Sequence, residues 1–321
     1  MSSSDLVLVA DVGGTNSRFG LVKAGELHPH GIEDVANDGF AGLHESIPAY
    51  IAKSGEKPVR AVLAIAGPIK DGLVHLTNRR GWSFRPEELA AKTGLERVEV
   101  VNDFAALAEA LPYIEELEPL GPGERLSDAT KVVLGPGTGL GVAGLVYRAA
   151  ADGKAEWIVV PSEGGHFEFA DLTDRETAVY GILRRDFGRV SAELVISGEG
   201  LERIDKAIGE LDGLSTDHRE GNEISEAARA GDARSLEVMQ LFFDALARFA
   251  GDMALTFVAR GGVYIGGGVL PKTLDLMDVD RFRMNFAAKK PHERLVSTIA
   301  TVLITAKTPA LTGCAAIAAR G

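Results

Sequence analysis

The chain has 321 residues, of which 45% are hydrophobic, and its formal net charge is -12. This length suits one large domain or two, and the negative charge argues against non-specific binding to nucleic acid or to an anionic membrane. No apolar run reaches the roughly 18 residues that span a bilayer, and the N-terminus lacks a basic region followed by an apolar segment, so we expect a cytoplasmic protein. The single cysteine, Cys314, excludes a disulfide or a multi-cysteine zinc site within one chain and is expected to be a small core residue.

The segment Leu6–Val22 consists of an apolar run, a polar turn and a second, alternating run, which predicts a strand, a turn and a strand. Gly13 and Gly14 have no Cβ, so a phosphate can approach the peptide N–H groups of this turn closely. The spacing excludes a P-loop, which requires Gly-Lys-[Ser/Thr], and a dinucleotide fingerprint, which opens a helix. Two interpretations stay open: an anion-binding turn and an ordinary Gly-Gly hairpin.

The next segments alternate between predicted helix and strand. Gly39–Lys53 has apolar residues at helical spacing, and Pro48 predicts a break or kink in that helix. Val59–Ala66 is almost entirely apolar, as expected of a strand in a buried sheet. Thr77–Phe84 is a polar loop, in which Asn78 either binds a polar ligand or satisfies its own turn.

Asp103 lies at a predicted junction of strand and helix. Arg97–Asp103 reads as a strand, and Phe104–Leu111 has one apolar helical face before Pro112. In open α/β sheets, ligand sites form where parallel strands meet helix N-termini. Asn102 or Asp103 therefore either caps the helix or serves a ligand site, and the two roles are compatible.

Lys131–Tyr147 repeats the opening pattern of apolar strand, glycine-rich turn with a threonine, and apolar strand. Two such units about 125 residues apart predict two similar halves, each offering a hairpin tip to an anion. The alternative is a coincidence of two glycine-rich hairpins.

Pro161–Phe169 places Glu163 and His166 around a Gly-Gly turn. Three mixed ligands, His166 with two glutamates, make a poor zinc site, whereas Glu and neutral His suit the hydroxyls of a polyhydroxylated ligand. Glu193, taken alone, reads as a solvated helix residue. Ser197–Gly200 reads as a turn.

The remaining segments are mostly predicted helices. Gly261–Pro271 is the exception, a short strand that runs into three glycines, against which a nucleotide base or ribose could lie. Leu295–Leu303 contains a further strand candidate. The predicted helices are Thr173–Phe187, Asn222–Ala230, Ala233–Arg260 and Pro309–Arg320.

Six pieces of sequence, in order and spacing, resemble the bacterial glucokinases of the hexokinase, actin and heat-shock-protein ATPase superfamily, and the likeness covers almost the whole chain. The chain lacks the cysteine-rich zinc motif of the neighbouring sugar-kinase and repressor family, so it is similar to the non-zinc glucokinase branch. The six pieces are DVGGTN, the Asn102-Asp103 strand end, LGPGTGLG, SEGGH, SAE and GGVYIGGG.

The resemblance implies an α/β protein with the two-domain, ribonuclease H-like fold of actin-like ATPases and an interdomain cleft. It implies a small domain formed by residues 1–112 and 306–321, and a large domain formed by residues 113–305. Homologues are commonly dimeric, so the resemblance also implies a homodimer.

The resemblance further implies ATP-dependent phosphorylation of glucose at its 6-hydroxyl, entering glycolysis, with ATP and Mg2+ and without zinc. Asp103 would be the catalytic base, and Asp11 would hold Mg2+ through water. The implied sugar contacts are Asn78, Asn102, Asp103, Glu163, His166 and Glu193. The implied ATP contacts are Ala10, Asp11, Val12, Gly13, Gly14, Thr15, Gly135, Gly137, Thr138, Gly139, Gly266, Gly267 and Gly268.

Two rival functions remain at this point. One is a kinase for another hexose or for an acyl group such as acetate, although the neutral and acidic candidate residues suit hydroxyls better than a carboxylate. The other is a non-catalytic sugar sensor on the same fold. Against a DNA-binding sensor, the predicted first strand starts at Leu6 and leaves no room for an N-terminal pair of DNA-binding helices.

Overall fold

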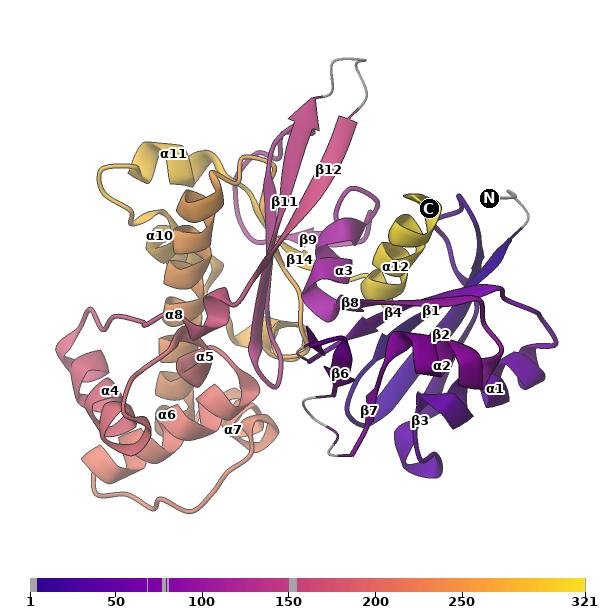
Figure 1. The fold of residues 1–321 in the computed structure, drawn as a ribbon. Coiled ribbons are helices and arrows are strands. Elements are labelled where there is room, and N and C mark those ends of the chain that lie inside the picture. The colour runs from indigo at the N-terminus through magenta and orange to yellow at the C-terminus, as the bar shows by residue number, and fades with distance from the viewer. Residues whose placement is uncertain (1–4, 68, 77–78, 80, 150–154, 321) are drawn as a thin grey trace. The chain divides into compact units, whose positions relative to one another are not determined.

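The computed structural model describes residues 5–67, 69–76, 79, 81–149 and 155–320. The chain forms two compact units: residues 1–115 with 306–321, and residues 116–305. Each unit is built on a β-sheet with helices packed against it (Figure 1), which confirms the predicted α/β class.

The first unit contains a five-stranded sheet in the order β3-β2-β1-β4-β8. Strands β1 and β2 form the predicted hairpin, and β1, β4 and β8 are mutually parallel neighbours. The strands are β1 (Leu6–Val12), β2 (Asn16–Lys23), β3 (His30–Ala36), β4 (Arg60–Ile65) and β8 (Arg97–Asn102), and a small separate sheet holds β5 (Ile69–Lys70), β6 (Leu73–His75) and β7 (Ser83–Phe84). The predicted contact residue Asn78 lies outside the described residues.

Both faces of the five-stranded sheet are covered, which explains why β1 and β4 read as continuous apolar runs. Val7 and Val9 pack with residues of α3 (Asp103–Ala110) and of the C-terminal helix α12 (Pro309–Arg320). On the other face, Leu8 packs with residues of α1 (Leu43–Ser54) and α2 (Pro86–Thr93). The fold thereby joins the end of the chain to its beginning.

Two local predictions for this unit have clear outcomes. Cys314 is a fully buried residue of α12, as predicted, and burial raises the pKa of its thiol. Pro48 was predicted to break or kink its helix, and the break is wrong, because Pro48 lies inside the continuous helix α1. Proline removes one backbone N–H there, while the buried side chains of Ile47 and Tyr50 on either side of it hold the helix against the sheet.

The second unit contains a six-stranded sheet in the order β12-β11-β10-β13-β14-β9. Antiparallel β12, β11 and β10 are followed by β13 and β14 parallel to β10, which repeats the order and directions of the first sheet. The prediction of two similar halves is confirmed at the level of topology. The strands are β9 (Leu117–Pro119), β10 (Lys131–Pro136), β11 (Leu140–Ala149), β12 (Ala155–Ser162), β13 (Val263–Ile265) and β14 (Thr301–Ile304).

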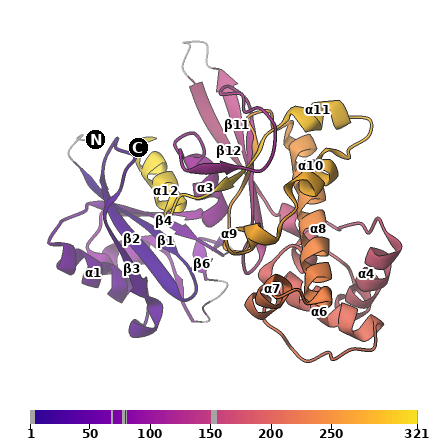
Figure 2. The same cartoon turned by 180° about the vertical axis from the view of Figure 1, so that it is seen from behind.

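Helix α8 is central to the helices of the second unit, because it contacts α6, α7, α10 and strand β10 (Figure 2). The predicted turn at Ser197–Gly200 is wrong, since Ser197 is the N-cap of α6 and its hydroxyl accepts a 3.0 Å hydrogen bond from Gly200. The predicted strand within Leu295–Leu303 begins only at Thr301. The helices are α4 (Asp174–Phe187), α5 (Ala192–Val195), α6 (Gly198–Leu211), α7 (Gly221–Arg229), α8 (Ala233–Phe257), α9 (Leu270–Thr273), α10 (Val279–Ala287) and α11 (Glu293–Thr298).

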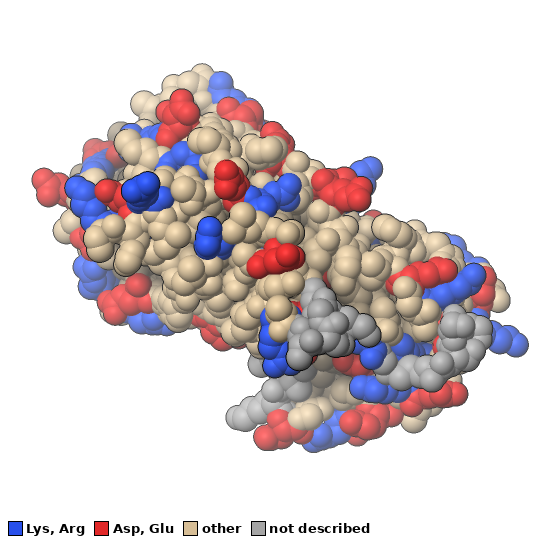
Figure 3. Space-filling model, turned by 90° about the horizontal axis from the view of Figure 1, so that it is seen from above, with Lys and Arg blue, Asp and Glu red and all other residues tan. Residues whose placement is uncertain are grey.

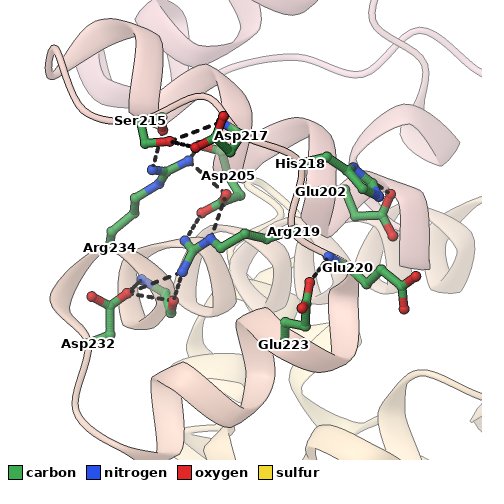
Figure 4. Close-up of polar contacts among 11 residues, drawn as sticks. Glu202, Asp205, Ser215, Asp217, His218, Arg219, Glu220, Glu223, Asp232 and Arg234 are labelled. Atoms are coloured by element: carbon green, nitrogen blue, oxygen red, sulfur yellow. Dashed lines mark hydrogen bonds and ion pairs between the residues drawn. The ribbon is translucent and has the colours of Figure 1, made fainter.

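A buried carboxylate connects three elements of this helical layer. Asp205 on α6 is 1% exposed and accepts hydrogen bonds from Arg219, which precedes α7, and from Arg234 on α8 (Figure 4). Arg234 also donates to the Ser215 carbonyl at 2.7 Å, so it holds the segment between α6 and α7 as well. On the face of the molecule shown in Figure 3, acidic and basic side chains are mixed, and neither charge forms a large patch of its own.

Candidate active site

The first glycine turn closes the β1–β2 hairpin, where the Gly13 amide donates to the Asn16 carbonyl at 3.0 Å. Asp11 lies one residue before the end of β1, opposite Arg18 on β2. Burial, together with the negative charge of Asp103, raises the pKa of Asp11 to about 6, against the opposing effect of Arg18. Asp11 and Asp103 therefore lie close enough to repel each other.

Asn102 and Asp103 lie where β8 runs into α3. The Asn102 side-chain oxygen accepts hydrogen bonds from Phe104 (3.0 Å) and Ala105 (3.1 Å), so Asn102 is the helix cap, one of the two roles that its position predicted. Asp103 is the first helical residue, and its Oδ1 accepts from the Phe104 amide at 2.9 Å. An acidic side chain is well placed there, because a helix N-terminus carries a partial positive charge.

Asp11 and Asp103 meet because of sheet geometry. β1 and β8 run parallel on either side of β4, so their carboxyl ends lie at the same edge of the sheet. This edge is where open α/β sheets place ligand sites.

The second glycine turn lies at the tip of the β10–β11 hairpin, with Gly135 inside β10. The Gly137 amide donates to the Gly139 carbonyl, and the Gly198 amide at the start of α6 donates to the Gly137 carbonyl, each at 2.8 Å. Gly267 has a positive φ of 81°, and a Cβ there would collide with the Pro136 carbonyl. The fold thus brings the glycines of segments 135–139 and 266–268 together.

Glu193 is tied to this second turn. Its Oε2 accepts a 2.9 Å hydrogen bond from the Leu140 amide, and a Cβ on Gly139 would collide with the same carboxylate. The interpretation of Glu193 as a solvated helix residue is therefore wrong. Its context, a four-residue helix packed behind the hairpin, is not visible in the local sequence.

His166 lies between two carboxylates. Its Nε2 is 3.9 Å from Glu163 Oε2 and its Nδ1 is 3.8 Å from Glu193 Oε1. Both distances are too long for hydrogen bonds, so His166 is hydrogen-bonded to neither carboxylate. The donors and acceptors of the three side chains lie close enough together to bind one polar ligand. In the described part of the chain, no three His, Cys, Asp or Glu side chains are grouped in a way that could hold a metal ion.

Sequence reasoning missed the residues behind the first glycine turn. The buried Asn37 donates from its side-chain amide to the carbonyls of Gly13 (2.9 Å) and Gly14 (3.2 Å). Arg79 donates to the carbonyls of Asn37 (2.8 Å) and Gly14 (3.3 Å), and its guanidinium lies 4.6 Å from the Trp82 ring centre. No local signal marks their contacts with the turn, because the carbonyls that accept from these two side chains lie more than 20 residues away in sequence.

Comparisons with known proteins give the same family by model and by sequence. The family model described as glucokinase matches residues 8–321. A glucokinase of Sinorhizobium fredii (strain NBRC 101917 / NGR234) is 39% identical over 316 residues, covering 97% of this chain and 91% of the relative. The glucokinase of Agrobacterium fabrum (strain C58 / ATCC 33970) is 38% identical with the same coverage.

Solved structures give the same picture. The crystal structure of a glucokinase from an Antarctic psychrotroph is similar with a TM-score of 0.87 and 35% identity, covering 99% of both chains. A glucokinase from Balamuthia mandrillaris, solved in complex with glucose, has a TM-score of 0.81 at 21% identity and covers 99% of this chain and 94% of its own. At that identity, the second likeness concerns the fold alone.

Proposed function

The chain belongs to the glucokinase family, whose reaction is the ATP-dependent phosphorylation of glucose, and from this premise we propose how its residues carry out that transfer. The fold is that of the actin-like ATPases, as the sequence predicted. The observation that carries the proposal is the carboxylate pair at the sheet edge, where Asp103 begins α3 beside Asp11.

Asp103 is the proposed catalytic base. Phosphoryl transfer depends mainly on positioning and on charge stabilisation, with a base near the attacking hydroxyl. Asp103 accepts the proton of the glucose 6-hydroxyl as that oxygen attacks the terminal phosphate, a contribution of about 10²–10⁴-fold in rate. The Phe104 amide, bonded to Oδ1, orients this carboxylate.

Glu163, His166 and Glu193 are the proposed readers of sugar hydroxyls, together with Asn102. The carboxylates accept hydrogen bonds, and a neutral imidazole both donates and accepts, which matches hydroxyls that do the same. The spacing of His166 from both carboxylates supports this role. Asn78 stays a predicted sugar contact.

ATP is the proposed donor, held by the glycine turns at 10–15 and 135–139 and by the glycines at 266–268. Asp11 suits a water-mediated Mg2+ contact, because two mutually repelling carboxylates are relieved by a nearby cation and Mg2+ prefers oxygen ligands. The ion would shield phosphate charge. The described residues offer no three-ligand cage, which fits an ion held largely by water and phosphate.

A substrate panel tests the proposal. Purified protein with ATP and Mg2+ is offered glucose, other hexoses and acetate, with ADP release and the phosphorylated product measured. We expect glucose 6-phosphate, with the highest kcat/KM for glucose. A higher kcat/KM for another sugar would support the rival kinase. Measurable sugar binding without any phosphorylation would support the sugar sensor.

A cytoplasmic homodimer remains part of the proposal, and the family resemblance implies the dimer. The charge of -12 supports the further expectation that the protein has no nucleic-acid or membrane partner. In the described part of the chain, none of the helices has the length and apolar character needed to cross a bilayer. Light scattering of the purified protein measures the oligomeric state.

A further inference from the structure

Three consecutive carbonyls of the first glycine turn accept hydrogen bonds from one residue, Asn37. Its side-chain Nδ2 donates to Gly13 (2.9 Å) and Gly14 (3.2 Å), and its backbone amide donates to Thr15 (2.9 Å). The three carbonyls therefore all point toward Asn37. Nothing in the local sequence required this arrangement, since Asn37 lies 22 or more residues further along the chain.

The direction of the carbonyls determines the direction of the amides. In a planar trans peptide, the N–H points opposite to the C=O, and the cis peptide found among the described residues is at Lys290-Pro291. The N–H groups of Gly14, Thr15 and Asn16 thus point away from Asn37. Neither the Gly14 nor the Thr15 amide donates to a group in the described part of the chain. Successive amides aimed to one side form an anion-binding nest.

We propose that Asn37 is a positioning residue that holds the first glycine turn with its amides directed at a phosphate of ATP. The inference rests on the proposed role of residues 10–15 in ATP binding and adds the group that orients them. Asn37 does not touch the nucleotide, because it bonds to the opposite side of the same peptides.

The orientation of Asn37 is itself constrained. Its Oδ1 accepts a 2.7 Å hydrogen bond from the Ser17 hydroxyl, and both residues are fully buried. The two glycine carbonyls can only accept, so the NH2 group must face them, which settles the amide assignment. Arg79 adds a second donor to the Gly14 carbonyl, at 3.3 Å.

The first test is Asn37→Asp, which keeps the size and the oxygen facing Ser17 but replaces the donor with an acceptor facing two carbonyls. Calorimetry measures the affinity for ATP, adenosine and glucose. We expect ATP to bind about tenfold or more weakly, since charge-assisted hydrogen bonds to phosphate are lost, with adenosine and glucose within about twofold. Ser17→Ala is the milder second variant, because it frees Oδ1 of Asn37 and leaves both donors, and it should weaken ATP alone by a smaller factor.

Tyr50→Phe is the matched control. It removes another hydrogen bond from a buried side chain to a glycine carbonyl in the same unit, Tyr50 to Gly31 at 2.7 Å. It should lower Tm without changing ATP affinity. Equal loss of ATP affinity in this control, or equal weakening of ATP and adenosine in Asn37→Asp, would overturn the proposal.

A second readout separates this inference from the proposed function. In wild-type protein labelled with 15N-glycine, the Gly14 amide resonance, identified by its absence in Gly14→Ala, should shift with ATP and not with adenosine. If it does not shift, the phosphate role of residues 10–15 fails. If it shifts, but folded Asn37→Asp binds ATP within about twofold of wild type, the turn keeps its role and the role of Asn37 is refuted.

Discussion

Oε2 of Glu193 accepts a 2.9 Å hydrogen bond from the amide of Leu140, the residue that directly follows the second glycine turn. Its other oxygen, Oε1, lies 3.8 Å from Nδ1 of His166. One carboxylate is thus shared between the proposed phosphate turn and the proposed sugar-binding group. Glu163, in contrast, has a side chain that is 90% exposed.

This sharing predicts different effects for the two glutamates. Both Glu163→Ala and Glu193→Ala should weaken glucose binding by about tenfold, the effect of one charge-assisted hydrogen bond. Only Glu193→Ala should also raise the KM for ATP, because it leaves the Leu140 amide without its acceptor. Glu193→Gln keeps an acceptor and should spare the KM for ATP. Calorimetry and steady-state kinetics measure both, and unchanged glucose affinity in both alanine variants would refute the sugar role.

Asp103→Asn should abolish turnover and leave glucose binding measurable. Asn retains an oxygen that can accept from the Phe104 amide, so the local geometry persists, but the amide is no base. We expect kcat to fall by about 10²–10⁴-fold, with the glucose Kd within about threefold of wild type. Near-normal kcat would contradict the assignment of Asp103 as the base.

Asp11 predicts a pH-dependent stability of the ligand-free protein. Its pKa is raised from 3.8 to about 6, so the folded state binds a proton that the unfolded state has already released between these values. The stability that the protonated carboxyl provides is fully present below pH 3.8 and is lost as the pH rises through about 6. The full loss corresponds to about 3 kcal/mol.

Asp11→Asn removes this penalty, so its gain in Tm over wild type should be larger at pH 8 than at pH 5. Thermal unfolding in metal-free and nucleotide-free buffer measures the gain at each pH. Asp5→Asn serves as the control, because Asp5 directly precedes the same strand and is not among the charges that act on Asp11. A gain that does not grow with pH would contradict the prediction.

Asp205→Ala should strongly destabilise the protein, because it leaves the Arg219 and Arg234 guanidinium groups without their buried partner (Figure 4). Removing one partner of a buried ion pair costs about 3–5 kcal/mol. Asp275→Ala breaks the exposed pair with Arg229 and should cost at most about 1 kcal/mol. Urea unfolding compares the two, and equal midpoints would show that the Asp205 cluster adds no stability.

Local sequence was enough for the elements whose form depends on a few consecutive residues. The β1–β2 and β10–β11 hairpins follow from short apolar runs around glycines, and Cys314 is a core residue because its neighbours are small and apolar. Order and spacing of motifs also identified the family correctly, since several weak signals in one sequence order are specific together.

Contacts between residues far apart in the chain could not be predicted from local sequence. Asn37 carries no local signal, and only the fold brings its side chain to the Gly13 carbonyl. Glu193, taken alone, reads as solvated until α5 packs behind the β10–β11 hairpin. Ser197 caps a helix and is not part of a turn, because the apolar side chains of α6 pack into the hydrophobic core of the second unit. For Asn37 and Glu193 the partner lies outside the local window, so packing of the sheet and helices, not local propensity, set the role of the side chain.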